Sequence, residues 1–211
     1  AIKNLSIKSK NNEIRRYINF YKLKNNSLQL VLLEQSIKKG TAKINVDLYF
    51  DDSGKIKNNF SLTGKVTNTE LLLPKNVKEL NFNFTLKDKN YKFEEIFFKL
   101  NKIKFNSELL DIQQKNNKFY VKGNLKSKKN KINDDIILLI FKNNLENVNF
   151  SNSNFESNSE FTFDFSKKFK IKNLKINSKL NIDELILNDN LLKIKNYIKN
   201  YNNFIKLKTN K

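Results

Sequence analysis

Hydrophobic and polar residues alternate with a period of two along most of this chain. The stretch from Gly40 to Val66 reads GTAKINVDLYFDDSGKIKNNFSLTGKV, and its apolar and polar positions alternate on both sides of the turn DDSG. A period of two is typical of a β-strand with one apolar and one polar face. The pattern therefore predicts two strands joined by a short turn, with every second side chain on a common apolar face.

The alternation continues in later segments, among them LNFNFTL (80–86), KFYVKGNL (118–125) and EFTFDF (160–165). Polar turns such as KDKN and SNSN separate the segments, and such short connections indicate an antiparallel meander. We predict strands over the ranges 41–50, 59–66, 68–73, 78–87, 91–100, 102–112, 117–126, 145–151, 159–166, 169–177 and 179–187.

The first forty residues show helical spacing instead. We expect a helix over 28–38, with Ser27 as its N-cap and Gly40 in the position after its end. In the preceding stretch EIRRYINFYKL, four residues at helical spacing share one face: Ile14, Tyr17, Ile18 and Tyr21.

Two later segments break the rhythm of the strands. The segment NDDIILLIFKNN (133–144) fits either a buried strand or a short helix, and LLKIKNYIKNY (191–201) favours a short helix. Composition does not shift anywhere along the chain, so we expect a single domain. Its parts are a helical lead-in over 1–40, antiparallel strands over 41–190, and a short helix and strand over 191–211.

The amino-acid composition limits which catalytic and metal-binding sites the chain can form. The chain has no Cys and no His, which excludes disulfides, thiol nucleophiles, Cys/His zinc sites and the usual general base near neutral pH. The adjacent carboxylates, such as Asp51 and Asp52, would face opposite ways on a strand and are ordinary solvated charge in a turn. The four glycines lie too far apart for a phosphate loop. We therefore expect no enzyme activity, catalytic residues, metal or cofactor.

The net charge is +20, which by itself favours a nucleic-acid-binding protein. Arg15 and Arg16 are the only arginines, however, and the lysines are scattered over outward strand positions. Lys, Asn, Ile and Phe are all abundant, as A- and T-rich codons would produce. We therefore attribute the charge to codon bias and expect no nucleic-acid partner.

Three features of the region 27–128 carry a resemblance to a known family. They are a helix ending in glycine before a strand (LLEQSIKKGTAKINVDLYF), a strand–turn–strand with an inner glycine (DDSGKIKNNFSLTGKV, followed by TELLL), and LNFNFTL followed by FYVKGNL. In these features the region resembles the AsmA-like proteins of Gram-negative bacteria, particularly the long YhdP-type members. The resemblance covers about half of the chain.

The resemblance implies a mostly β fold, an elongated, curved antiparallel meander with an open groove and one or two short helices near the N-terminus. It also implies a bridge-like lipid carrier in the periplasm, held at the inner membrane by a helix outside this chain, which we expect to be a piece of a longer protein. Phospholipid acyl chains would be the ligands and would pass toward the outer membrane. The apolar residues expected to line the groove are Ile44, Val46, Leu48, Phe50, Phe60, Leu62, Val66, Leu80, Phe82, Phe84, Leu86, Phe119, Val121 and Leu125.

Two alternatives stay open at this point. The apolar face can instead be closed by the helices and by another part of the sheet, as in a β-sandwich that serves as a structural or interaction domain of the cell envelope. A basic nucleic-acid-binding β domain would need lysines and aromatic residues on one exposed face, whereas here they mostly alternate onto opposite faces.

Overall fold

The computed structural model describes residues 2–23, 27–57, 59–72, 77–100, 102–116, 118–131, 148–149, 154–166, 170–188 and 204–208. Its two helices are α1 (Ile14–Lys22) and α2 (Leu28–Ser36). Its strands are β1 (Asn4–Lys8), β2 (Asn12–Glu13), β3 (Ile37–Tyr49), β4 (Ser61–Leu71), β5 (Val77–Lys87), β6 (Asn90–Leu100), β7 (Ile103–Lys115), β8 (Lys118–Lys131), β9 (Val148–Asn149), β10 (Asn154–Ser166), β11 (Ile171–Ile182), β12 (Glu184–Asn188) and β13 (Phe204–Lys208).

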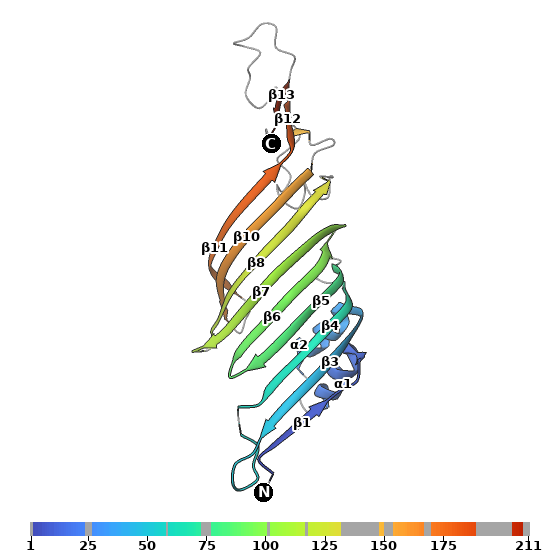
Figure 1. Cartoon of the computed structure of the whole chain (residues 1–211), viewed down its shortest axis with the longest axis vertical. Helices are drawn as coiled ribbons and strands as arrows, with labels where there is room; N and C mark the ends of the chain where they lie inside the picture. The colour runs from blue at the N-terminus through green and yellow to red at the C-terminus, as the bar shows by residue number, and fades with distance from the viewer. Residues whose placement is uncertain are drawn as a thin grey trace. The chain divides into compact units, whose positions relative to one another are not determined.

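Ten of these strands form one open sheet. Its order is β1-β3-β4-β5-β6-β7-β8-β10-β11, with β2 paired to β3, so that β1 and β11 stand at opposite ends and the sheet does not close. Successive strands from β3 to β7 are antiparallel neighbours, as the ribbon shows (Figure 1). The predicted mostly β fold, an antiparallel meander with two short helices near the N-terminus, is confirmed.

The chain divides into two compact units. The first unit comprises residues 1–125 and 159–177, and the second comprises 126–158 and 178–211. In the second unit, β13, β12 and β9 form a small antiparallel sheet. Asp183 accepts a hydrogen bond from the Asn154 side-chain amide at 3.0 Å and pairs with Lys129 at 3.1 Å, which ties β8, the start of β10 and the β11–β12 turn together.

The register of the first unit sorts its side chains into two faces. On one face, apolar residues stand opposite one another from β3 to β7, in the rows Val46–Leu62–Leu86–Tyr91–Ile112 and Ile44–Gly64–Phe84–Phe93–Leu110. We call the face that carries these two rows the apolar face. Between them, on the other face, lies the polar row Asn45–Thr63–Thr85–Lys92–Asp111.

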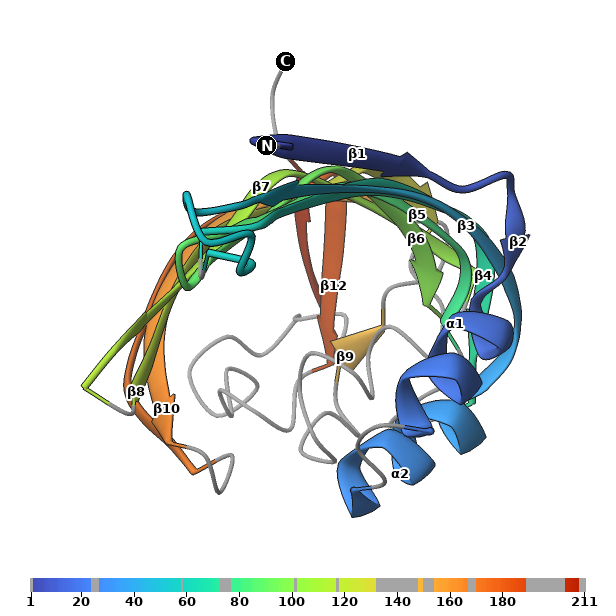
Figure 2. The same ribbon diagram turned by 90° about the horizontal axis from the view of Figure 1, so that it is seen from below.

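Extra residues interrupt the pairing of β4, β5 and β6. The register shifts coincide with three non-glycine residues of positive φ, namely Asn68 (49°), Glu79 (53°) and Glu95 (52°). Each shift is a β-bulge, and bulges increase the local twist and bend of a strand. The strands of this unit accordingly follow an arc (Figure 2).

The two helices lie inside one end of this arc, beside β3 and β4 (Figure 2). Tyr17 of α1 donates a hydrogen bond from its hydroxyl to the Ala42 carbonyl at 3.2 Å, and Ile18 is buried. Arg15 donates to the carbonyl of Ile37 from Nε at 3.0 Å and from Nη2 at 2.5 Å. These contacts fasten α1 to the beginning of β3.

The N-terminal region differs in three details from the sequence predictions. The predicted lead-in over 1–40 is only partly helical, because β1 and β2 pair with β3 along its edge. The helix predicted over 28–38 is present but ends two residues earlier, at Ser36. Ser27 occupies its N-cap position, as predicted, but makes no side-chain capping hydrogen bond. Gly40 does not end the helix: it lies within β3 at φ 149°, where an added Cβ would come within 2.3 Å of the Thr69 hydroxyl.

Strand boundaries also differ from the predictions. The strands predicted over 59–66 and 68–73 form one strand, β4, which continues through the bulge at Asn68. The strand predicted over 169–177 continues to Ile182 as β11. The segments 133–144 and 191–201 lie outside the described residues.

Candidate functional site

The apolar face of the first unit holds at least half of the fourteen predicted lining residues. Seven of them stand opposite one another in register across β3, β4 and β5: Ile44, Val46, Leu62, Val66, Phe82, Phe84 and Leu86. Their sharing of one face follows from the pairing of the strands, since residues directly opposite in a sheet point to the same side. The structure thus brings together side chains from three strands into one surface.

The other predicted residues flank this group. Leu48 stands opposite Leu5 of β1, and Leu80 stands opposite Thr69 of β4. Phe50 follows β3 and forms an isolated bridge with Ile56. The remaining four lie just before β4 or within β8: Phe60, Phe119, Val121 and Leu125.

Aromatic rings extend the surface from β5 to β10. The Phe82 ring lies 5.6 Å from that of Phe93, and the Tyr91 ring lies 6.4 Å from that of Phe119. Phe119 in turn stacks on Phe165 at 4.8 Å, with the two ring planes 12° apart. On β10, neighbouring ring centroids of Phe161, Phe163 and Phe165 are 6.1 and 6.2 Å apart. The apolar surface therefore continues well beyond the predicted set.

Several members of this surface were not among the predicted lining residues. They are Tyr91, Phe93, Leu110, Ile112, Phe161, Phe163 and Phe165. The alternation of apolar and polar residues in EFTFDF indicated that Phe161, Phe163 and Phe165 of β10 share one face. In β6, the extra residue at Glu95 interrupts the alternation of apolar and polar residues. The segment YKFEEIFF therefore does not show the continuous alternation that indicates one apolar face.

Two glycines lie beneath aromatic rings on this surface. A Cβ added at Gly64 would come within 2.6 Å of the Phe84 ring and within 2.5 Å of the Lys43 carbonyl oxygen. A Cβ added at Gly123 would come within 2.7 Å of the Phe161 ring. The absence of a side chain at both positions lets a phenyl ring lie directly against the backbone.

Much of the apolar face remains accessible in the first unit. Of the predicted lining residues, Val66 and Val121 are buried, Phe60 is exposed, and the others are half-buried. The described residues of this unit include no second sheet over the face, and α1 and α2 pack beside β3. A hollow of about 540 Å³ opens where Phe60, Leu86 and Tyr91 meet the β5–β6 turn.

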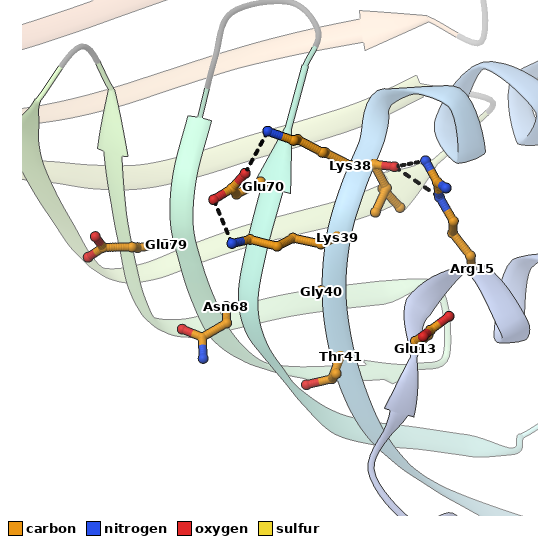
Figure 3. A pocket seen from close by; sticks show the side chains of 10 residues that line it. Glu13, Arg15, Lys38, Lys39, Gly40, Thr41, Asn68, Glu70 and Glu79 are labelled. Carbon is orange, nitrogen blue, oxygen red and sulfur yellow. Dashed lines mark hydrogen bonds and ion pairs between the residues drawn. The ribbon is translucent and has the colours of Figure 1, made fainter.

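A larger hollow, of about 630 Å³, lies around the beginning of β3, and most of the residues that line it are charged or polar (Figure 3). Glu70 pairs there with Lys39 at 2.9 Å and with Lys38 at 3.5 Å. The hydrogen bond from Lys39, followed by the charges of Lys39 and Lys38, holds the pKa of Glu70 below its usual value. The charges of Glu70, Lys38 and Lys39 are thus paired with one another, which favours a structural role for the residues around this hollow.

The other carboxylates with shifted pKa values also have structural partners. The pKa of Asp51 is lowered by hydrogen bonds from the Ser53 hydroxyl and the Lys55 backbone amide within the turn DDSG. The pKa of Glu34 is lowered by its hydrogen bond with Lys22. Among the described residues, no cluster of three or more Asp or Glu side chains could hold a metal ion.

No family model, curated protein or solved structure matches this chain. No helix in the described part of the chain has the length and apolar character needed to span a bilayer.

Proposed function

We propose that the apolar face binds the acyl chains of phospholipids, as a non-enzymatic segment of an AsmA-like lipid carrier. Such a carrier would stand in the periplasm, anchored in the inner membrane outside this chain, and would pass phospholipid between the two membranes. The observation that carries the proposal is the pair of apolar rows, which cross five strands on a face that stays partly exposed.

The energetics of lipid transfer support an extended apolar surface of this kind. Moving an acyl chain into water costs about 0.8 kcal/mol per CH₂, or roughly 13 kcal/mol for a sixteen-carbon tail. A carrier offsets this cost only with continuous apolar contact along the tail. A row without a polar interruption provides such contact, and it needs no specific polar group.

The dimensions agree as well. Strands in a sheet are about 4.8 Å apart, so a row across five strands extends over about 19 Å. One lipid tail covers half of a hydrocarbon core about 30 Å thick, or about 15 Å. The row Val46–Leu62–Leu86–Tyr91–Ile112 is therefore long enough to lie alongside a whole tail.

The test compares two double variants that differ only in the face that receives the charge. Val46→Glu with Leu86→Glu places two carboxylates on the apolar face, and Asn45→Glu with Thr85→Glu places two on the polar row one residue away. Each protein is purified from bacterial cells, checked by circular dichroism, and analysed for bound phospholipid by native mass spectrometry and extraction.

We expect wild type and the Asn45/Thr85 variant to carry phospholipid, and the folded Val46/Leu86 variant to carry none. A wild type that is free of lipid, monomeric and cooperatively folded would mean that protein closes the apolar face, as in the sandwich alternative. Equal amounts of lipid in both variants would likewise overturn the proposal.

A further inference from the structure

The end of the helical hairpin exposes large apolar side chains. Ile18, in the middle of α1, is 7% exposed, but Phe20 is 77%, Leu23 is 85% and, at the start of α2, Leu28 is 70% exposed. We call Phe20, Tyr21, Leu23 and Leu28 the hairpin tip. Exposure thus rises toward the tip, where four large apolar side chains are exposed within nine residues; single exposed apolar residues are ordinary, whereas a group of them marks an interaction site.

The second helix of the hairpin is apolar on all sides. Its sequence, LQLVLLEQS, places Leu or Val at five of nine positions, and these five positions are spread around the helix axis. None of its described side chains is buried, and Leu32 and Leu33 are both exposed. A helix that is apolar all round is expected in a protein core or in a membrane environment.

The exposure of the tip does not come from a loosely attached hairpin. Lys22 of α1 and Glu34 of α2 form an ion pair at 2.7 Å that joins the two helices. Arg15 and Tyr17 hydrogen-bond to backbone carbonyls of β3. The hydrogen bonds of Arg15 and Tyr17 fix the base of the hairpin, and the Lys22–Glu34 ion pair holds the two helices together next to the tip.

The charge around the hairpin favours one occupant. The segment 13–39 contains six basic and two acidic residues, and a third carboxylate, Glu70, pairs with Lys38 and Lys39, so a basic excess remains around the hairpin. Arg16, which is exposed, lies one helical turn before Phe20 on the same side of α1. An apolar tip with aromatic residues and a basic surround matches the interface of an anionic bilayer, where apolar side chains enter the headgroup boundary and basic ones stay at the phosphates. A second copy of this strongly basic chain would instead meet repulsion.

We propose that the hairpin tip docks on anionic membrane surfaces by inserting Phe20, Leu23 and Leu28 into the headgroup region. This proposal is independent of acyl-chain binding on the apolar face. The two features nevertheless adjoin one another, because an added Cβ at Gly40 of β3 would come within 2.9 Å of Ile14 at the base of α1. A docked hairpin would therefore bring one end of the apolar face close to the bilayer.

The test is flotation of the whole chain with lipid vesicles. The vesicles are either phosphatidylethanolamine and phosphatidylglycerol at about 3:1 or pure phosphatidylcholine. The variant is Leu23→Ser with Leu28→Ser, and the matched control is Leu174→Ser with Ile176→Ser, which removes two exposed apolar residues from β11. We expect wild type and control to float with anionic vesicles, with binding that weakens in high salt. The tip variant should bind at least about tenfold more weakly.

Two further measurements separate this proposal from acyl-chain binding and from self-association. The folded tip variant should retain any phospholipid that co-purifies with wild type, and the Val46→Glu, Leu86→Glu variant should still float with vesicles. A tip variant that floats as well as wild type would overturn the docking proposal. So would a wild type that does not float but forms a dimer, by light scattering, that the tip substitutions disperse.

Discussion

Substitution of Gly64 by alanine tests the packing of the apolar face most directly. In a strand interior, replacing glycine by alanine ordinarily stabilises a protein by about 0.5–1 kcal/mol, because the unfolded chain loses conformational freedom. Here the new Cβ would lie 2.5 Å from the Lys43 carbonyl oxygen and 2.6 and 2.8 Å from two atoms of the Phe84 ring. The backbone oxygen belongs to a paired strand and cannot move away without disturbing the ladder.

Overpacking of this kind costs typically about 1–3 kcal/mol. Set against the usual gain, the substitution should lower the free energy of unfolding by about 0.5–2 kcal/mol. The assay is urea denaturation followed by circular dichroism. Gly54 is the control, because nothing lies within 4 Å of its added Cβ and its φ of 80° is tolerated by asparagine. Gly54→Asn should therefore change stability by less than about 0.5 kcal/mol.

A double-mutant cycle locates the clash. If the Phe84 ring contributes to the cost, adding Phe84→Leu to Gly64→Ala should recover at least about 0.5 kcal/mol beyond the sum of the single effects. The remaining cost would come from the Lys43 carbonyl. A Gly64→Ala protein that is as stable as wild type, or more stable, would refute the close approach of the ring to the backbone.

Three other predictions concern polar contacts. Asn124→Ala removes the acceptor for the Glu108 amide (2.9 Å) and should lower the free energy of unfolding by about 0.5–1.5 kcal/mol in urea denaturation, whereas Asn124→Asp, which keeps an acceptor, should cost less. The folded-state pKa of Glu70 lies below its usual value near 4.5, so the Glu70 carboxylate stabilises the fold above that pH. This stabilisation is lost as the pH falls through the lowered pKa. The urea midpoint should therefore fall less between about pH 6 and pH 3 in Glu70→Gln than in wild type. Asp51→Ala removes an acceptor for two backbone amides at 2.9 Å in the β3–β4 turn and should lower the urea midpoint, whereas Asp51→Asn should leave it nearly unchanged. Equal midpoints for the two variants would contradict this role of Asp51.

Sequence reasoning recovered the features of this fold that depend on neighbouring residues. Alternation in segments such as LNFNFTL assigned strands and apolar sides correctly, because successive side chains of a strand point to opposite faces whatever the strand pairs with. The polar turns between segments were equally local signals, and they were sufficient to predict an antiparallel meander.

Only the tertiary structure decided which of these residues meet. Register is set by the pairing of separate strands. The row that joins Val46, Leu86 and Ile112 therefore cannot be recognised within any one sequence segment. The bulges at Glu79 and Glu95 carry no local signal, because glutamate rarely adopts positive φ unless its neighbours enforce it. Ile37 and Gly40, which the sequence placed at the end of a helix, belong instead to β3, which pairs with β4. The free energy gained by pairing two strands exceeds the weak intrinsic stability of the last turn of a short helix.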